Sequence, residues 1–133
     1  MSNTLLDLNL TESLDKLHKK EISSVELTQA YIESIESMDH LNAFITKTPE
    51  LALEQAKQSD ERRAKGDALP LEGVPIANKD LFCTKDVKTT AGSRILGNFV
   101  PTYESTVTQK LLDNGVVTLG KLNLDEFAMG SAN

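Results

Sequence analysis

Residues 71–82, LEGVPIANKDLF, set a lysine inside an apolar stretch, and this feature restricts most strongly what the chain can fold into. Such a stretch is typical of a buried strand, where a lysine either reaches solvent with its ammonium or is held by partners. Strand side chains alternate between two faces, so Asp80 is expected opposite Lys79 and need not neutralise it. Because desolvation favours the neutral amine, a buried Lys79 would be able to act as a general base. The alternative is a strand-end lysine that is solvated or paired with Asp80.

Residues 1–70 have the pattern of a helical segment. Ser23 and Glu26 have the spacing of a capping box, and the apolar residues that follow recur on one helical face. We expect helices that begin near Thr11, at Ser23 and at Thr48-Pro49. The last of these should end at Gly66, since glycine commonly terminates helices. The short apolar run LNAFITKT, residues 41–48, predicts a strand.

Residues 71–133 read as strand, loop, helix and strand. We expect strands over 73–78 and 116–121, separated by a loop rich in Gly, Thr and Ser over 84–98. A helix capped by Ser105 or Thr106 should end at Asn114-Gly115, and residues 122–133 should form a loop or a short helix. This order predicts an α/β fold with a parallel pair of strands.

Charge and cysteine content exclude several classes of protein. The net charge of −6 argues against a surface that grips nucleic acid phosphates by itself. The single cysteine, Cys83, allows no internal disulfide and fits a reducing cytosol. The N-terminus lacks the pattern of a signal peptide, and no stretch approaches the length of a membrane span. We therefore expect a cytoplasmic protein without membrane contacts.

Other candidate sites are weak. Residues 115–121 match G-x-x-x-x-G-K, but Leu122 replaces the hydroxyl residue that a phosphate-binding loop needs. His18 and His40 are far apart and belong to no Cys/His cluster, so no metal site is predicted. Cys83 has no histidine nearby in sequence, and we interpret it as an ordinary, partly buried thiol.

Three motifs resemble the N-terminal part of the amidase signature family. They are G-V-P-x-x-x-K-D from Gly73, T-T-A-G-S from Thr89, and L-D-E-F-A-M-G-S from Leu124. The helical start EISSVELTQAYIESIESMDHLNAFIT is similar as well. The resemblance implies a mixed central sheet covered by helices, with residues 1–133 forming the N-terminal part of a single amidase domain. Asp86 stands where glycine is commoner in the family, and Ala132 stands where a second serine is commoner.

Members of this family use a lysine, a serine with a cis peptide bond and a nucleophilic serine. The resemblance assigns the catalytic lysine to Lys79, which would take a proton from the bridging serine. Both serines belong to a Gly/Ser-rich stretch beyond residue 133 in the family, so we expect a truncated chain that is inactive alone. The resemblance also implies that Met129, Gly130 and Ser131 lie near the substrate, although a simple helix cap is an equal alternative.

The loop motif, by contrast, is interpreted as structural. Thr89, Thr90 and Ser93 are expected to shape the loop rather than to take part in chemistry.

Within the family, the resemblance implies the glutamine-hydrolysing subunit of a tRNA-dependent amidotransferase. Released ammonia would pass to a partner subunit that uses ATP and magnesium to amidate mischarged Glu-tRNA(Gln) or Asp-tRNA(Asn). The B and C subunits of the amidotransferase would be the partners, tRNA would be held mainly by the partner subunit, and this chain would hold no cofactor. Two alternatives stay open: a stand-alone amidase for small amides, and a non-catalytic interaction fragment.

Overall fold

The computed structural model of the chain describes residues 5–131, so Ala132 lies outside the described residues. Its elements are α1 (Leu10–His18), α2 (Ser24–Ser37), β1 (Phe44–Lys47), α3 (Pro49–Lys65), β2 (Pro75–Lys79), α4 (Thr106–Leu112) and β3 (Val117–Leu122). Short 3-10 turns span Asp39–Leu41, Arg94–Leu96 and Glu126–Ala128. No helix of the described part is long and apolar enough to cross a membrane.

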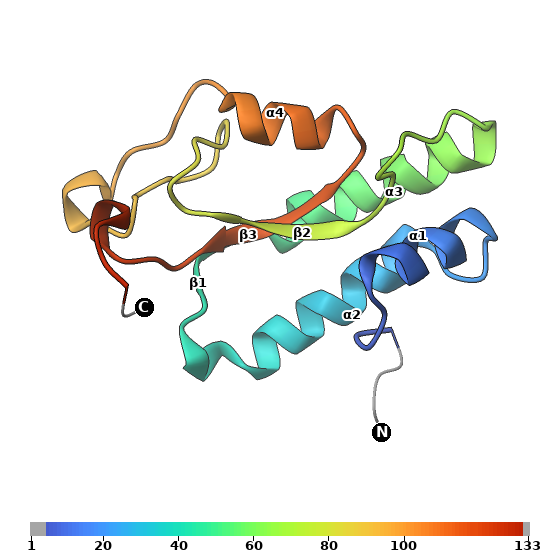
Figure 1. Ribbon diagram of the computed structural model, residues 1–133, viewed down its shortest axis with the longest axis horizontal. Coiled ribbons are helices and arrows are strands. Elements are labelled where there is room, and N and C mark those ends of the chain that lie inside the picture. Colours follow the sequence, from blue (N-terminus) through green and yellow to red (C-terminus); the bar gives the residue numbers. More distant parts are fainter. Residues whose placement is uncertain (1–4, 132–133) are drawn as a thin grey trace.

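The three strands form one mixed sheet in the order β1-β3-β2 (Figure 1). The central strand β3 runs parallel to β2 and antiparallel to β1. The predicted parallel pair is therefore confirmed, and β1 adds an antiparallel edge. A mixed sheet with helices on it is the predicted α/β class.

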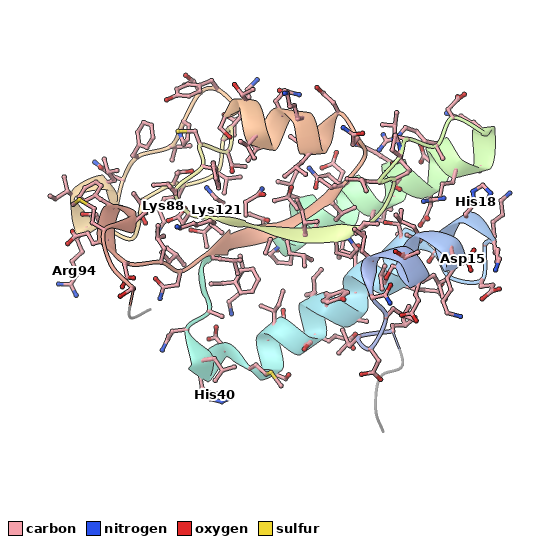
Figure 2. The ribbon with its side chains drawn as sticks, in the orientation of Figure 1. Asp15, His18, His40, Lys88, Arg94 and Lys121 are labelled. Carbon is pink, nitrogen blue, oxygen red and sulfur yellow. The ribbon has the colours of Figure 1, made fainter. Side chains whose placement is uncertain are left out.

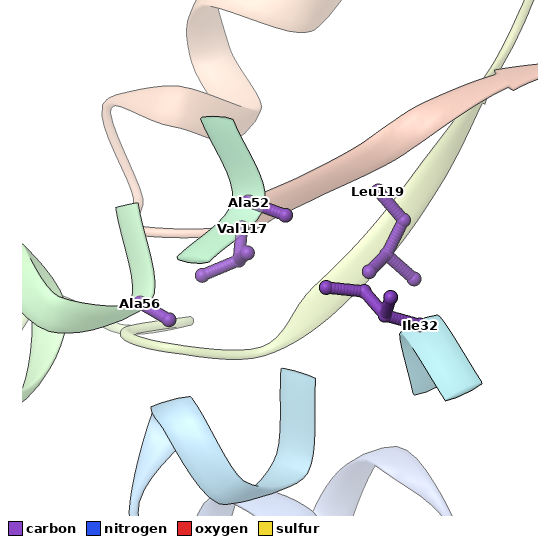
Figure 3. Packing of buried hydrophobic residues seen from close by; sticks show 5 residues of the cluster. All are labelled: Ile32, Ala52, Ala56, Val117 and Leu119. Atoms are coloured by element: carbon purple, nitrogen blue, oxygen red, sulfur yellow. The ribbon is translucent and has the colours of Figure 1, made fainter. Parts of the chain in front are cut away.

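Helices α2 and α3 cover one face of the sheet, while α4 lies on the other side of β2 and β3 (Figure 1). Ala52 and Ala56 stand one turn apart on α3, and their small side chains allow this helix to approach β3 closely. The core cluster shown in Figure 3 joins both helices to β3; its members are Ile32, Ala52, Ala56, Val117 and Leu119. A second cluster, Leu17, Leu27 and Val74, attaches α1 to α2 and the start of β2.

The helix termini follow local side-chain chemistry. The capping box of α2 is confirmed, because Ser23 Oγ accepts from Glu26 N and Glu26 Oε2 accepts from Ser23 N. Helix α1 begins earlier than predicted, because Asn9 rather than Thr11 provides its cap. Thr48 and Pro49 begin α3 as predicted, but Thr48 makes no side-chain cap bond, since its Oγ1 donates to Thr118 O on β3 instead.

Two further predicted boundaries are confirmed. Gly66 ends α3 with φ of 85°, and Ser105 caps α4 by accepting from Thr108 N. Asp86 has φ of 60°, in the left-handed region that favours glycine. Its backbone conformation fits the position where glycine is commoner.

A β-bulge in β3 changes the direction of the residues after it. Ile76 pairs with Thr118, and Asn78 pairs with Lys121, so β3 holds one residue more than β2 between these pairs. Gly120 lies in this bulge with φ of 149°. An extra residue reverses the alternation of side chains. Lys121 therefore does not follow Val117 and Leu119 into the core beneath α2 and α3.

Candidate active site

Lys79 is the last residue of β2, and its side chain is exposed. Among the described residues β2 is an edge strand with β3 as its partner and is only partly covered, so Lys79 is not buried by this part of the chain. That the complete fold buries this strand stays a prediction. The expected separation of Lys79 from Asp80 is confirmed. Asp80 is fully buried and pairs with another lysine.

The fully buried lysine is Lys121 on β3. Its Nζ lies 3.2 Å from Asp80 Oδ1, 2.8 Å from Phe82 O and 2.8 Å from Thr89 Oγ1. Phe82 O and Thr89 Oγ1 accept hydrogen bonds from the ammonium, and Asp80 Oδ1 is its ion-pair partner. Burial lowers the pKa of Lys121, and the negative charge of Asp80 opposes that effect. Figure 2 shows Lys121 on the side of the sheet away from α1 and α2.

Asp80 links the end of β2 to the T-T-A-G-S motif. Its Oδ2 accepts hydrogen bonds from both the backbone N and the Oγ1 of Thr90. Its backbone O accepts from Ala91 N at 2.9 Å, and its own N donates to Leu122 O at 3.0 Å. The segment that follows Lys79 is therefore fixed both to the loop and to β3.

The loop residues bind other parts of the protein. Thr89 accepts from Lys121, Thr90 donates to Asp80, and Ser93 Oγ donates to Glu126 Oε1 at 2.6 Å. These contacts agree with the expectation that the three hydroxyl residues shape the loop.

Met129, Gly130 and Ser131 are exposed and follow the 3-10 turn Glu126–Ala128. Within the described residues, we find no direct hydrogen bond or ion pair between Lys79 and any of these three residues. The segment after Lys79 is connected to this turn indirectly, through Ala91. Ala91 N donates to Asp80 O, and Ala91 O accepts from Phe127 N at 2.8 Å.

Sequence reasoning missed Lys121 and Asp80 as partners. The signal was present in VVTLGKL, where a lysine also stands among apolar residues of a strand. The order of strands decides which lysine is buried, and that order is not visible in the sequence.

The structure also shows where Cys83 lies and whether side chains that could bind a metal come together. Cys83 is partly buried, and its Sγ lies 3.6 Å from Tyr103 OH. Among residues 5–131, no three His, Cys, Asp or Glu side chains gather in a way that could hold a metal ion.

The amidase family matches residues 26–133 of this chain. The A subunit of the glutamyl-tRNA(Gln) amidotransferase of Caulobacter vibrioides (strain NA1000 / CB15N) is 58% identical over 98% of the chain. The protein of the same name from Gluconobacter oxydans is 61% identical over 96% of the chain. The chain spans 27% and 26% of the length of these relatives.

Solved structures are similar to this chain as well. A native peptide amidase from Stenotrophomonas maltophilia superposes with a TM-score of 0.84 at 34% identity, covering 90% of this chain and 25% of the other. An inhibitor-bound complex described as revealing the origins of an s-triazine catabolic enzyme gives 0.88 at 36% identity, covering 92% and 28%. The chain belongs to the amidase signature family.

Proposed function

We propose that this chain is the lysine-bearing part of a glutamine-hydrolysing amidase subunit of a tRNA-dependent amidotransferase. The observation that carries the proposal is the 58–61% identity to the A subunits of two glutamyl-tRNA(Gln) amidotransferases over nearly the whole chain. Ammonia from glutamine would serve to convert mischarged Glu-tRNA(Gln) to Gln-tRNA(Gln).

In this proposal Lys79 is the general base. Its place at the carboxyl end of β2, a strand parallel to its neighbour β3, supports the role, since ligands of α/β sheets bind near such ends. If sequence beyond residue 133 covers Lys79 in the complete fold, desolvation would favour its neutral amine. That amine would accept the proton of a bridging serine, which in turn would activate the nucleophilic serine. Both serines would come from sequence beyond residue 133. Met129, Gly130 and Ser131 would contribute backbone N–H groups and a hydroxyl near the amide.

The test is Lys79→Ala in the full-length protein that contains this sequence. Loss of a general base should lower the kcat of ammonia release from glutamine about 10³-fold or more. Lys79 belongs to neither core cluster, so the thermal midpoint should stay close to that of the wild type. Turnover near that of the wild type would contradict the assignment.

Lys110→Ala is the matched control. Lys110 is an exposed lysine on α4, in the same half of the chain. Its removal should leave both kcat and the thermal midpoint unchanged, which separates the role of Lys79 from a general effect of lost charge.

A stand-alone amidase is the second candidate, because a peptide amidase has the same fold at 34% identity. The two are distinguished by substrate. Faster hydrolysis of peptide amides than of glutamine by the full-length wild-type protein would favour the second candidate.

The wider proposal concerns partners. We place ATP and magnesium on a partner subunit, with the B and C subunits completing the assembly in the cytoplasm. The net charge of −6 fits a chain that leaves most contacts with tRNA to that partner.

A further inference from the structure

The ion pair between Lys121 and Asp80 lies directly beside Lys79. Both side chains are fully buried, with Nζ and Oδ1 3.2 Å apart. A buried pair is seldom explained by stability alone, because well-packed apolar residues of similar size often serve as well or better. The position of this pair therefore suggests that it holds the backbone around Lys79 in place.

The contacts of this pair enclose the backbone of Lys79. Asn78 and Lys79 pair with Lys121 and Leu122 of β3, and the N of Asp80 continues the ladder by donating to Leu122 O. Beyond Lys79, the carbonyl of Phe82 is held by Lys121 Nζ at 2.8 Å. The residues on both sides of Lys79 are thus fixed to the same short piece of β3.

The same ammonium also holds the loop. Thr89 Oγ1 accepts from Lys121 Nζ, and the adjacent Thr90 donates to Asp80. One buried cation therefore connects β3, the segment after Lys79 and the T-T-A-G-S motif. Removing its N–H donors would break the contacts of β3 with Asp80, Phe82 and Thr89 at the same time.

We propose that Lys121 is a positioning residue for Lys79, fixing the segment that follows Lys79 to β3 so that the amine of Lys79 keeps one direction. This inference rests on the proposed function of Lys79. The role requires the N–H donors of Lys121 and not merely the volume of its side chain.

The first experiment is Lys121→Met in the full-length protein, with Lys110→Met as the matched control. Methionine keeps the length of the side chain and removes the donors. Misplacement of a catalytic group by about 1 Å costs on the order of 10²-fold, so kcat for glutamine should fall by about that factor while KM changes little. Lys110→Met should leave both values unchanged. A kcat for Lys121→Met within about twofold of the wild type, much less than the cost of such a misplacement, would overturn the inference.

A double variant separates positioning from folding. In Asp80→Asn with Lys121→Met neither buried charge is left unpaired, so the thermal midpoint should recover relative to Lys121→Met. The bonds to Phe82 and Thr89 remain absent, so kcat should stay low. Recovery of kcat together with stability would show that Lys121 acts on folding alone, and the inference would fail.

Amide hydrogen exchange reports on the same segment without any assay of activity. The N–H groups of Thr90 and Ala91, both bonded to Asp80, should exchange about tenfold faster or more in Lys121→Met. Ala52 N–H in α3 should not change, since its acceptor is Thr48 O. Unchanged exchange at Thr90 and Ala91 would contradict the inference. A wild-type protein that releases no ammonia from glutamine would instead refute the proposed function, and exchange would still decide whether Lys121 orders this segment.

Discussion

Glu72 is fully buried just before β2, and it depends on partners from α3 and the preceding turn. Its carboxylate accepts from Arg62 Nη2 at 2.7 Å, Arg62 Nε at 3.0 Å and Leu69 N at 3.1 Å. Burial raises the pKa of Glu72, but these hydrogen bonds and the charge of Arg62 outweigh it and lower the pKa overall. The ionised carboxylate therefore joins α3 to the turn that leads into β2.

Glu72→Gln should make the protein less sensitive to acid. Because the pKa of Glu72 is lowered in the folded state, its carboxylate stabilises the fold fully above about pH 4.5. This stabilisation is lost as the pH falls through the folded-state pKa. At neutral pH the variant should lose about 1–2 kcal/mol, within the range for hydrogen bonds to charged groups and reduced because Arg62 is partly exposed. Thermal melts of the full-length protein from about pH 7 to 3 measure both effects.

Glu54→Gln provides the control for this acid effect. Glu54 is an exposed acid on α3, in contact with Gln58. Its replacement should leave the dependence of the melting temperature on pH unchanged. An equal loss of acid sensitivity in both variants would assign the effect to net charge and not to the buried carboxylate.

The two lysines show which features of the structure can be predicted from patterns of residues. Lys79 and Lys121 both stand in apolar sequences, and the same reasoning applies to each. Burial differs because β3 is central and β2 lies at the edge, which depends on contacts between distant segments. Local chemistry such as the Ser23 capping box could be predicted, whereas the buried partner of Asp80 could not.

At the scale of elements, the bulge in β3 sets the direction of Lys121. Gly120 has φ of 149°, and a Cβ there would collide with the carbonyl of Thr46 on β1. Glycine thus permits both the bulge and the close approach of β1. The predicted span of this strand was nearly right, but the bulge is invisible to a simple alternation of side chains.

Gly120→Ala should destabilise the fold by at least about 2 kcal/mol, because a strained backbone and an overpacked contact add together. Gly66→Ala is the matched control, since Gly66 also has positive φ but a Cβ there would meet nothing within 4 Å. That change should cost about 1 kcal/mol from backbone strain alone. Urea unfolding of both variants measures the difference, and equal costs would show that the contact with Thr46 is unimportant.

At the scale of the whole molecule, large apolar side chains are exposed along residues 81–129. They are Leu81, Ile95, Phe99, Val100, Tyr103, Val107, Phe127 and Met129. Surface of this kind usually contacts another part of a protein or a partner. The unpaired edge of β2 belongs to the same half of the chain.

We expect purified residues 1–133 to bind a hydrophobic dye, to melt without cooperativity and to release no ammonia from glutamine above the buffer background. The exposed apolar surface and the open strand edge account for the first two results. The third follows if the nucleophile comes from later sequence. Fluorescence titration, calorimetry and an ammonia assay test them, and a sharp two-state melt of a clean monomer would contradict the expectation on stability.

The strand order has a consequence for synthesis on the ribosome. The central strand β3 is the last strand of the described chain to be translated, and its neighbours β1 and β2 precede it by many residues. Neither of those strands pairs with the other, so the sheet cannot close until residue 122 has left the exit tunnel. Until that moment the apolar faces of α2 and α3 have no sheet to cover. The nascent chain thus passes through a long interval in which chaperones have access to its future core.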